Sequence, residues 1–295
     1  MMKINNIYIK NIIKKYFLFT DLGMRITSFG GYNHKDLKLI KYNKAFRNIH
    51  KGKRCFILGN GPSLSKEDLS KLKSEIVFVV NQASKISEYN KISPEYYFCV
   101  DQVFFSLDSN DVNDKQTIDS FISLKSETCN PICFIPAKYK EAVKKYEIDK
   151  LLEVRYFVEA LRMVDKRQKF VDYTKVVTSF GTVVQYAITM AVYMGFEKIY
   201  LLGCDNTGIV ATINSILKKD NDELYSYAVS ENENKRMERM VSRNGLEAYC
   251  ESYLYTLQDY RKLFKYCASN GCQLINCSSS TVIDSIPRKK LSDIL

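Results

Sequence analysis

Short apolar runs alternate with amphipathic segments along most of this chain. Runs of three to five mostly apolar residues predict strands over residues 54–58, 76–80, 96–100, 132–136, 198–202 and 273–276. Helices are predicted over 179–195 and 252–269, the second because apolar residues recur every three or four positions. Apolar strands separated by helices are typical of a parallel sheet that is covered on both faces. The pattern therefore predicts an α/β fold with a doubly wound, mostly parallel, Rossmann-like sheet.

Two segments depart from this alternation. Residues 1–50 are basic and amphipathic, and lysines interrupt the apolar residues of the first 22 positions too often for a membrane span. Such a segment fits either an anionic membrane surface or an ordinary packed helix. Residues 207–250 lose strong periodicity and become charged, which predicts a helical lid over the site. A solvated helical hairpin without a role is the alternative. The expected domains are 1–50 and a catalytic domain, 51–295.

Composition restricts the partners and the compartment. The net charge of +11, from 44 Lys and Arg against 33 Asp and Glu, favours phosphorylated ligands or acidic membranes. No nucleic-acid-binding motif accompanies it, so no nucleic acid partner is expected. The nine cysteines include no Cys-x-x-Cys pair, and we expect free thiols rather than a zinc site. Without a signal-peptide cleavage site, we expect a cytoplasmic protein, at most peripheral on the inner face of the cytoplasmic membrane.

Polar residues follow several of the predicted strands directly. Asn60 and Ser63 follow the first strand, and the pairs Asn81-Gln82, Asp101-Gln102 and Asp205-Asn206 follow three others. Because ligands of open α/β sheets bind beyond the carboxyl ends of the strands, these side chains are the candidates for a binding site.

The loop from Gly59 to Ser63 is the strongest single candidate. Its glycines would let backbone N–H groups approach a ligand, and Pro62 presets the backbone for a following helix. That helix, capped by Ser63 or Ser65, would favour phosphate at its N-terminus. The loop lacks the third glycine of a dinucleotide fingerprint and the Gly-Lys-Ser/Thr of a P-loop, which argues against NAD and against an ATPase. A plain strand-to-helix turn is the structural alternative.

Several segments together resemble a known family. Residues 56–64, 79–82, 178–181 and 198–205, with 274–278 near the end, are similar to the bacterial CMP-sialic acid-dependent sialyltransferases of lipooligosaccharide synthesis. They equally resemble the related MptE-like domain of flagellin-modifying motility accessory proteins and of an archaeal pterin diphosphokinase. The resemblance covers residues 53–295 in order, and the Gly59 loop and the Asn81-Gln82 pair are its most specific parts.

The resemblance implies a GT-A-like single domain and an inverting glycosyltransferase. It would move sialic acid or a related 2-keto sugar from a CMP-sugar donor to a cell-surface or lipid-linked glycan, such as lipopolysaccharide or capsule. Three alternatives stay open. One is an MptE-like transferase that uses another nucleotide sugar or moves a phosphoryl or diphosphoryl group. The others are a non-catalytic nucleotide-binding module and a flagellin-type protein glycosyltransferase. A homo-oligomer is also left open.

The same resemblance implies roles for individual residues. Asn60 and Ser63 would lie near the donor phosphate, and Asn81 and Gln82 at the phosphate and sugar. Ser179 would contact the sialic acid carboxylate, and Asp205 the ribose hydroxyls. Asp101 falls where the sialyltransferases carry Asn and the MptE-like proteins often carry Asp. The expected nucleotide-sugar site comprises Gly59, Asn60, Gly61, Pro62, Ser63, Asn81, Gln82, Asp101, Thr178, Ser179, Gly181, Asp205 and Asn276.

The general base is where the chain departs from the sialyltransferases, which use a histidine between the lid and the last helix. This chain has only His34 and His50, both ahead of the nucleotide loop, and we expect packing or surface roles for them. Glu251 is the first candidate base, Glu247 the second, and Tyr253 a third catalytic candidate. A carboxylate serves well as a base near neutral pH if burial raises its pKa. The alternative is that Glu251 simply faces solvent.

No metal cofactor is expected. The Asp220-Asn221-Asp222 run has the Asp-x-Asp form with which many glycosyltransferases bind a divalent ion, so Mg²⁺ or Mn²⁺ is the alternative. The run does not follow a predicted strand, however, and the resembling sialyltransferases release a nucleoside monophosphate without metal.

Overall fold

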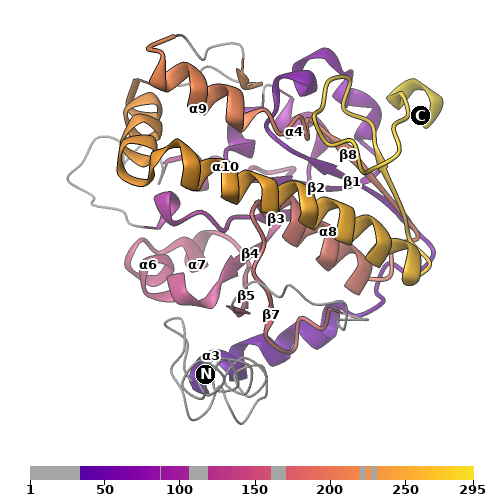
Figure 1. Cartoon of the computed structure of the whole chain (residues 1–295). Helices are drawn as coiled ribbons and strands as arrows, with labels where there is room; N and C mark the ends of the chain where they lie inside the picture. Colours follow the sequence, from indigo (N-terminus) through magenta and orange to yellow (C-terminus); the bar gives the residue numbers. More distant parts are fainter. Residues whose placement is uncertain (1–33, 87, 106–118, 161–170, 220–223, 227–230) are drawn as a thin grey trace, which may run out of the picture.

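The computed structural model describes residues 34–86, 88–105, 119–160, 171–219, 224–226 and 231–295 (Figure 1). Side chains are described from residue 245 onward in the last of these ranges. The first 33 residues and the Asp220-Asn221-Asp222 run therefore lie outside the described residues. Among the described helices, none combines the length and the apolar sequence that crossing a membrane requires.

Seven parallel strands form one sheet in the order β5-β4-β3-β2-β1-β8-β9. They are β1 (Arg54–Leu58), β2 (Ile76–Val80), β3 (Tyr96–Phe98), β4 (Ile132–Pro136), β5 (Val154–Phe157), β8 (Lys198–Leu202) and β9 (Gln273–Asn276). A second, two-stranded sheet pairs β6 (Glu159–Ala160) with β7 (Val177–Thr178). The expected α/β class with a Rossmann-like parallel sheet is confirmed.

The strands are apolar throughout because both faces of the sheet are covered. Along β1, Cys55 and Ile57 pack into one hydrophobic core, and Phe56 and Leu58 pack into the other. The first core is closed by α8 (Val183–Tyr193) and α10 (Glu231–Ser269), which cross the sheet on the same face in Figure 1. The second is closed by α4 (Tyr89–Ile92), α6 (Lys140–Lys145), α7 (Ile148–Leu151) and short helical turns.

The predicted helix after Gly61 is wrong. The chain forms two 3-10 turns there, η3 (Pro62–Lys66) and η4 (Leu69–Leu72). Gly61 precedes η3 without any side-chain cap, and the Ser63 side chain bonds to Asp205 instead of capping a helix. The Asp68 carboxylate then accepts from the N–H of Ser70 and caps η4. A five-residue 3-10 turn has little macrodipole, so the expected phosphate attraction at a helix N-terminus loses its basis.

The helix boundaries near the second half of the chain also differ. α8 begins after Thr182 rather than at 178–179, because Thr182 and Gln185 form a reciprocal capping box. In the predicted lid, α9 (Gly208–Ile216) packs against α10. Gly245 has a φ of 75° and interrupts α10, so two helices meet at this residue. The described part of residues 207–250 is therefore largely helical.

The remaining elements are short. In the described part of the basic N-terminal segment, α3 (His34–Leu39) is followed by η2 (Ile40–Phe46). The Asn43 amide donates to the carbonyl oxygens of Tyr156 (2.8 Å) and Tyr173 (3.1 Å), which fixes η2 beside β5. The other 3-10 turns are η5 (Ala83–Lys85), η6 (Gln102–Phe104), η7 (Ala137–Tyr139) and η9 (Leu291–Asp293).

Candidate functional site

The sheet reverses its strand order between β1 and β8. The chain proceeds from β1 outward to β5 on one side, then returns to β8 and β9 on the other. At such a switch point the loops after the two central strands separate into opposite layers, and ligands of open α/β sheets bind in the resulting crevice. A ligand site is therefore expected at the loops after β1 and β8.

These two loops are bonded directly to each other. The Gly59 N–H donates to the Leu202 carbonyl and the Gly61 N–H to the Gly203 carbonyl, both at 2.8 Å. A Cβ atom on Gly59 would lie 2.4 Å from the Gly203 oxygen, and one on Gly61 would lie 2.6 Å from Cγ of Asp205. The glycines are thus required for the close approach of two loops. Their N–H groups donate to the protein itself in this arrangement.

Asp205 and Ser63 form the buried centre of this contact. The Asp205 carboxylate accepts from the Ser63 N–H at 2.7 Å and from the Ser63 hydroxyl. Both residues are almost completely inaccessible to solvent. Burial raises the pKa of Asp205, and the hydrogen bonds from Ser63 partly oppose that shift. In this conformation the two side chains hold the loops together and are turned toward each other instead of toward a ligand.

Four buried polar atoms near the same loops lack a hydrogen-bond partner among the described residues. They are Oδ1 of Asn60, Oδ1 of Asn81, Nδ2 of Asn206 and Oγ of Ser226, which we call the amide cluster. Three of them follow β1, β2 and β8, the central strands of the sheet. Leaving a buried polar group unpaired costs about 1–3 kcal/mol, so a protein rarely gathers several without a use for them. The amide cluster is the clearest indication of a ligand position.

Hydrogen bonds of its side chains and backbone hold the amide cluster in place. The Asn60 amide donates to the Val80 carbonyl at 3.1 Å, which joins the loops after β1 and β2. The Tyr97 hydroxyl donates to the Asn81 carbonyl at 2.8 Å. The Ser226 N–H donates to the Asn60 carbonyl at 3.1 Å, so the described residues 224–226 contact the loop after β1. Asn81 and Asn206 have φ values of 46° and 56°, left-handed conformations that asparagine tolerates well.

The other predicted binding residues lie at the same edge or near it. Gln82 precedes η5, and Asp101 follows β3 on the surface. The hydroxyl groups of Ser179 and Tyr186 lie 3.4 Å apart, and the Gly181 N–H donates to Gln185.

Thr178 ends β7 and is buried. Asn276 is buried too, and its amide bonds to the Thr281 hydroxyl and the Ser278 N–H. Asn276 therefore organises the segment after β9.

A charged group that the sequence analysis missed lies beside Ser179. Glu159 is largely buried, pairs with Lys138 at 2.5 Å, and accepts a hydrogen bond from the Tyr186 hydroxyl. Burial raises the pKa of Tyr186 well above its ordinary value, so this hydroxyl stays protonated as a donor. The three residues come from η7, β6 and α8. No sequence pattern links positions so far apart, and the two-residue strand that carries Glu159 has no detectable periodicity.

The catalytic candidates on α10 point in different directions. Glu247 and Glu251 are exposed, and Glu251 accepts from the exposed Tyr255 hydroxyl at 3.0 Å. Neither carboxylate therefore has the buried environment that we expected of a general base. Tyr253 faces inward, and its hydroxyl donates to the Asn206 carbonyl at 2.6 Å. Tyr253 alone of the three contacts a residue of the amide cluster, and the catalytic role of each stays a prediction.

His50 and eight of the nine cysteines pack inside the protein. His50 stacks on Phe196 and bonds the Tyr96 hydroxyl at 2.7 Å, near the amino ends of the strands and away from the loops above. All nine cysteines are free thiols, as expected; eight of them are buried, and Cys250 is exposed. Within the described residues, no three His, Cys, Asp or Glu side chains gather as a metal site.

Comparison with known proteins identifies the family. The family described as 6-hydroxymethylpterin diphosphokinase MptE-like matches residues 32–207, which span β1 to β8 and the loops that carry most of the site. Searches of curated proteins and of solved structures found no match. Because the family match covers more than half of the chain, the protein belongs to the MptE-like family. Membership indicates an enzyme of the transferase type.

Proposed function

We propose that this MptE-like protein is an inverting glycosyltransferase that uses a CMP-sugar, with sialic acid or a related 2-keto sugar as the group transferred. The observation that carries the proposal is the amide cluster at the ends of β1, β2 and β8. The acceptor is a glycan of the cell surface, free or lipid-linked.

The chemistry of the amide cluster suits the neutral parts of such a donor. Amide and hydroxyl groups both donate and accept hydrogen bonds, as recognition of a pyrimidine base, a ribose and sugar hydroxyls requires. Binding would supply partners for Asn60, Asn81, Asn206 and Ser226 and so remove the cost of leaving them unpaired. Two of the four atoms, Nδ2 of Asn206 and the Ser226 hydroxyl, can donate, and fixed uncharged donors stabilise charge that develops on a leaving phosphate.

The acceptor hydroxyl must lose a proton during transfer. Tyr253 is unsuited to accept it, because burial raises the pKa of its phenol and keeps it protonated. We propose Tyr253 as a positioning residue, which ties α10 to the loop after β8. Glu251 remains the proposed base. Glu251 is exposed here, so α10 would have to move to bring it closer to the donor. Gly245, where the helix is already interrupted, is the position at which α10 would bend.

The family description supports a second candidate, transfer of a diphosphoryl group from a nucleoside triphosphate. Both reactions would place a nucleotide at the switch point, so a donor panel separates them. Hydrolysis and thermal stabilisation are measured with CMP-, UDP-, GDP- and dTDP-sugars and with ATP, each with and without Mg²⁺.

Turnover of the CMP-sugar without metal is expected. Preference for a UDP-sugar with metal, or for ATP, would overturn the CMP assignment. Unchanged turnover in Glu251→Gln would remove Glu251 as the base.

A further inference from the structure

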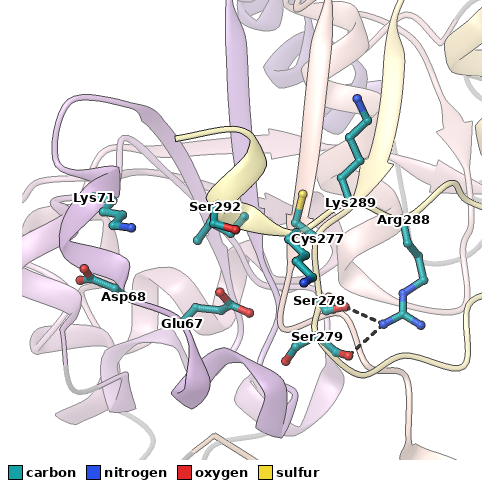
Figure 2. Close-up of a pocket in the computed structure, with 11 residues that line it drawn as sticks. Glu67, Asp68, Lys71, Cys277, Ser278, Ser279, Arg288, Lys289 and Ser292 are labelled. Atoms are coloured by element: carbon teal, nitrogen blue, oxygen red, sulfur yellow. Dashed lines mark hydrogen bonds between the residues drawn. The ribbon is translucent and has the colours of Figure 1, made fainter.

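A cavity of about 520 Å³ lies outside the amide cluster, between the turns after β1 and the segment after β9 (Figure 2). Its lining residues are Glu67, Asp68, Lys71, Cys277, Ser278, Ser279, Arg288, Lys289, Lys290, Leu291 and Ser292. None of them belongs to the amide cluster. Cavities of roughly 300–1,000 Å³ are typical of small-molecule sites, so this one is large enough for a sugar with an attached charged group.

The cavity is rich in cationic side chains. Four come from Lys71 and the Arg288-Lys289-Lys290 run, against the carboxylates of Glu67 and Asp68. Asp68 already accepts from the Ser70 N–H and hydroxyl, at 3.2 and 2.6 Å. Among the described residues, the three lysines form no ion pair. The lining therefore has an excess of positive charge, with four cationic groups against two carboxylates.

Arg288 is fixed in position at this cavity. Its guanidinium donates to the carbonyl oxygens of Ser278 (3.3 Å) and Ser279 (2.8 Å), as Figure 2 shows. These bonds hold the side chain in one orientation. They do not neutralise its positive charge, because both acceptors are uncharged carbonyl groups. A guanidinium held in this way loses less entropy when it binds a planar carboxylate or a phosphate oxygen pair.

The inner lining is neutral. Burial raises the pKa of Cys277 to about 11, and the nearby Glu67 adds to the shift, so Cys277 lines the cavity as an uncharged thiol. Leu291 is buried as well, whereas Ser279 and Ser292 present exposed hydroxyl groups. Cationic, hydroxyl-bearing and apolar surfaces together fit a small polar molecule with one anionic group.

The cavity also has a direct structural link to the switch point. The Ser278 hydroxyl accepts from the Cys204 N–H at 2.8 Å, one residue before Asp205. A ligand that orders the segment after β9 would therefore act on the same loop that Asp205 and Ser63 hold together.

We propose that this cavity is a second binding site, for a sugar that carries a phosphate or a carboxylate group. The site is separate from the amide cluster and does not depend on the proposed donor. If the proposed glycosyl transfer also holds, the bound sugar is the acceptor, and the acceptors are acidic glycans.

Calorimetric titration at fixed ionic strength tests the proposal. The probes are glucose 1-phosphate for the phosphate arm, glucuronic acid for the carboxylate arm and glucose as the neutral control. They are titrated into the full-length protein and into the double variant Lys289→Gln/Lys290→Gln. The matched control is Lys218→Gln/Lys219→Gln, which removes the same charge from two exposed lysines just after α9.

We expect at least one anionic probe to bind the wild type, and we expect no binding of glucose. The cavity variant should weaken that binding about tenfold, as the loss of two charge-assisted contacts implies, and the control variant less than about twofold. A larger effect with glucose 1-phosphate would assign phosphate, and one with glucuronic acid would assign carboxylate.

The proposal is overturned if neither anionic probe binds, or if the two double variants weaken binding equally. It is also overturned if Asn81→Gly, in the amide cluster, abolishes probe binding. CMP is titrated into the same preparations as a separate measurement. If CMP binds and the anionic probes do not, this proposal fails and the proposed nucleotide site stands; if the probes bind and CMP does not, the reverse holds.

Discussion

Single residues at the switch point are constrained by steric fit as much as by chemistry. Gly61 faces the Asp205 side chain and the Gly203 carbonyl at distances that leave no room for a methyl group. The sequence analysis singled out this glycine for the close approach of a ligand. The contact that requires a glycine in the structure is instead with a second loop, and Ser63 and Asp205, which bond across it, are 142 residues apart along the chain.

We predict that Gly61→Ala lowers the free energy of unfolding by about 2 kcal/mol or more, since backbone and buried carboxylate atoms would have to move. Gly208→Ala is the control, because its new methyl group would meet only the hydroxyl at the end of the Tyr249 side chain and no backbone atom. Urea unfolding of both variants measures the effect. Equal stability of the two would contradict the tight contact between the loops.

His50 should make stability depend on pH. Burial lowers its pKa from 6.5, and nearby Lys53 lowers it further. The unfolded chain then binds the proton more readily than the folded one, so the contribution of neutral His50 is complete above pH 6.5 and is lost as pH falls below it. We predict that the stability advantage of wild type over His50→Gln shrinks between about pH 7 and about pH 5. A difference independent of pH in urea unfolding would refute this.

The residues of the site were predictable only in part. Asn60 and Asn81 follow apolar strands, and the edge they share is a consequence of the parallel fold, so the sequence could place them together. Ser226 and Glu159 could not be found in this way. Ser226 follows no strand and reaches the site through one backbone hydrogen bond, and Glu159 follows a half-exposed edge strand.

At the scale of elements, α10 shows why residue type alone misled the choice of a base. Its inward stripe consists of Tyr249, Tyr253, Thr256 and Tyr260, spaced three or four residues apart. Glu247 and Glu251 fall on the other side of the same helix. The helical spacing was visible in the sequence, but the glutamates were chosen for their chemistry. The tyrosines define the face that packs inward, against α8, α9 and the loop after β8.

The docking of α10 gives a direct test. Tyr253→Phe removes one hydrogen bond, to the Asn206 carbonyl, and is predicted to lower the free energy of unfolding by about 1 kcal/mol. Tyr255→Phe removes a hydroxyl that bonds the exposed Glu251, and no measurable change is expected from it. If both variants unfold at the same urea concentration as wild type, Tyr253 does not hold α10 to the loop after β8.

The strands themselves were largely predictable, since burial on both faces leaves a continuous apolar run. Six of the seven strands of the main sheet appear in the sequence in this way. β5 was missed because it is an edge strand with Arg155 and Tyr156 half-exposed, which breaks the apolar pattern. The helix expected after Gly61 was wrong because a tertiary bond, from Ser63 to Asp205, replaced the local cap.

At the scale of the whole molecule, the fold brings separate signals to one place. The order reversal between β1 and β8 places the loops of both strands together, and the amide cluster lies where β1, β2 and β8 end. The excess of positive charge, +11 for the chain, favours the anionic nucleotide and the anionic sugar of the two proposed sites.

The central claim is that a nucleotide binds at the amide cluster, and a calorimetric titration of CMP into wild type and Asn81→Gly tests it most directly. Asn81 has a φ of 46°, which glycine adopts freely, so this variant removes the amide and keeps the backbone. Asn48→Gly is the matched control, because Asn48 is also left-handed, at 59°, and precedes β1 at the far end of the sheet.

We predict that CMP binds the wild type, that Asn81→Gly weakens binding about tenfold, and that Asn48→Gly leaves it unchanged. Absence of CMP binding to the wild type, or equal affinity in Asn81→Gly, would contradict the claim.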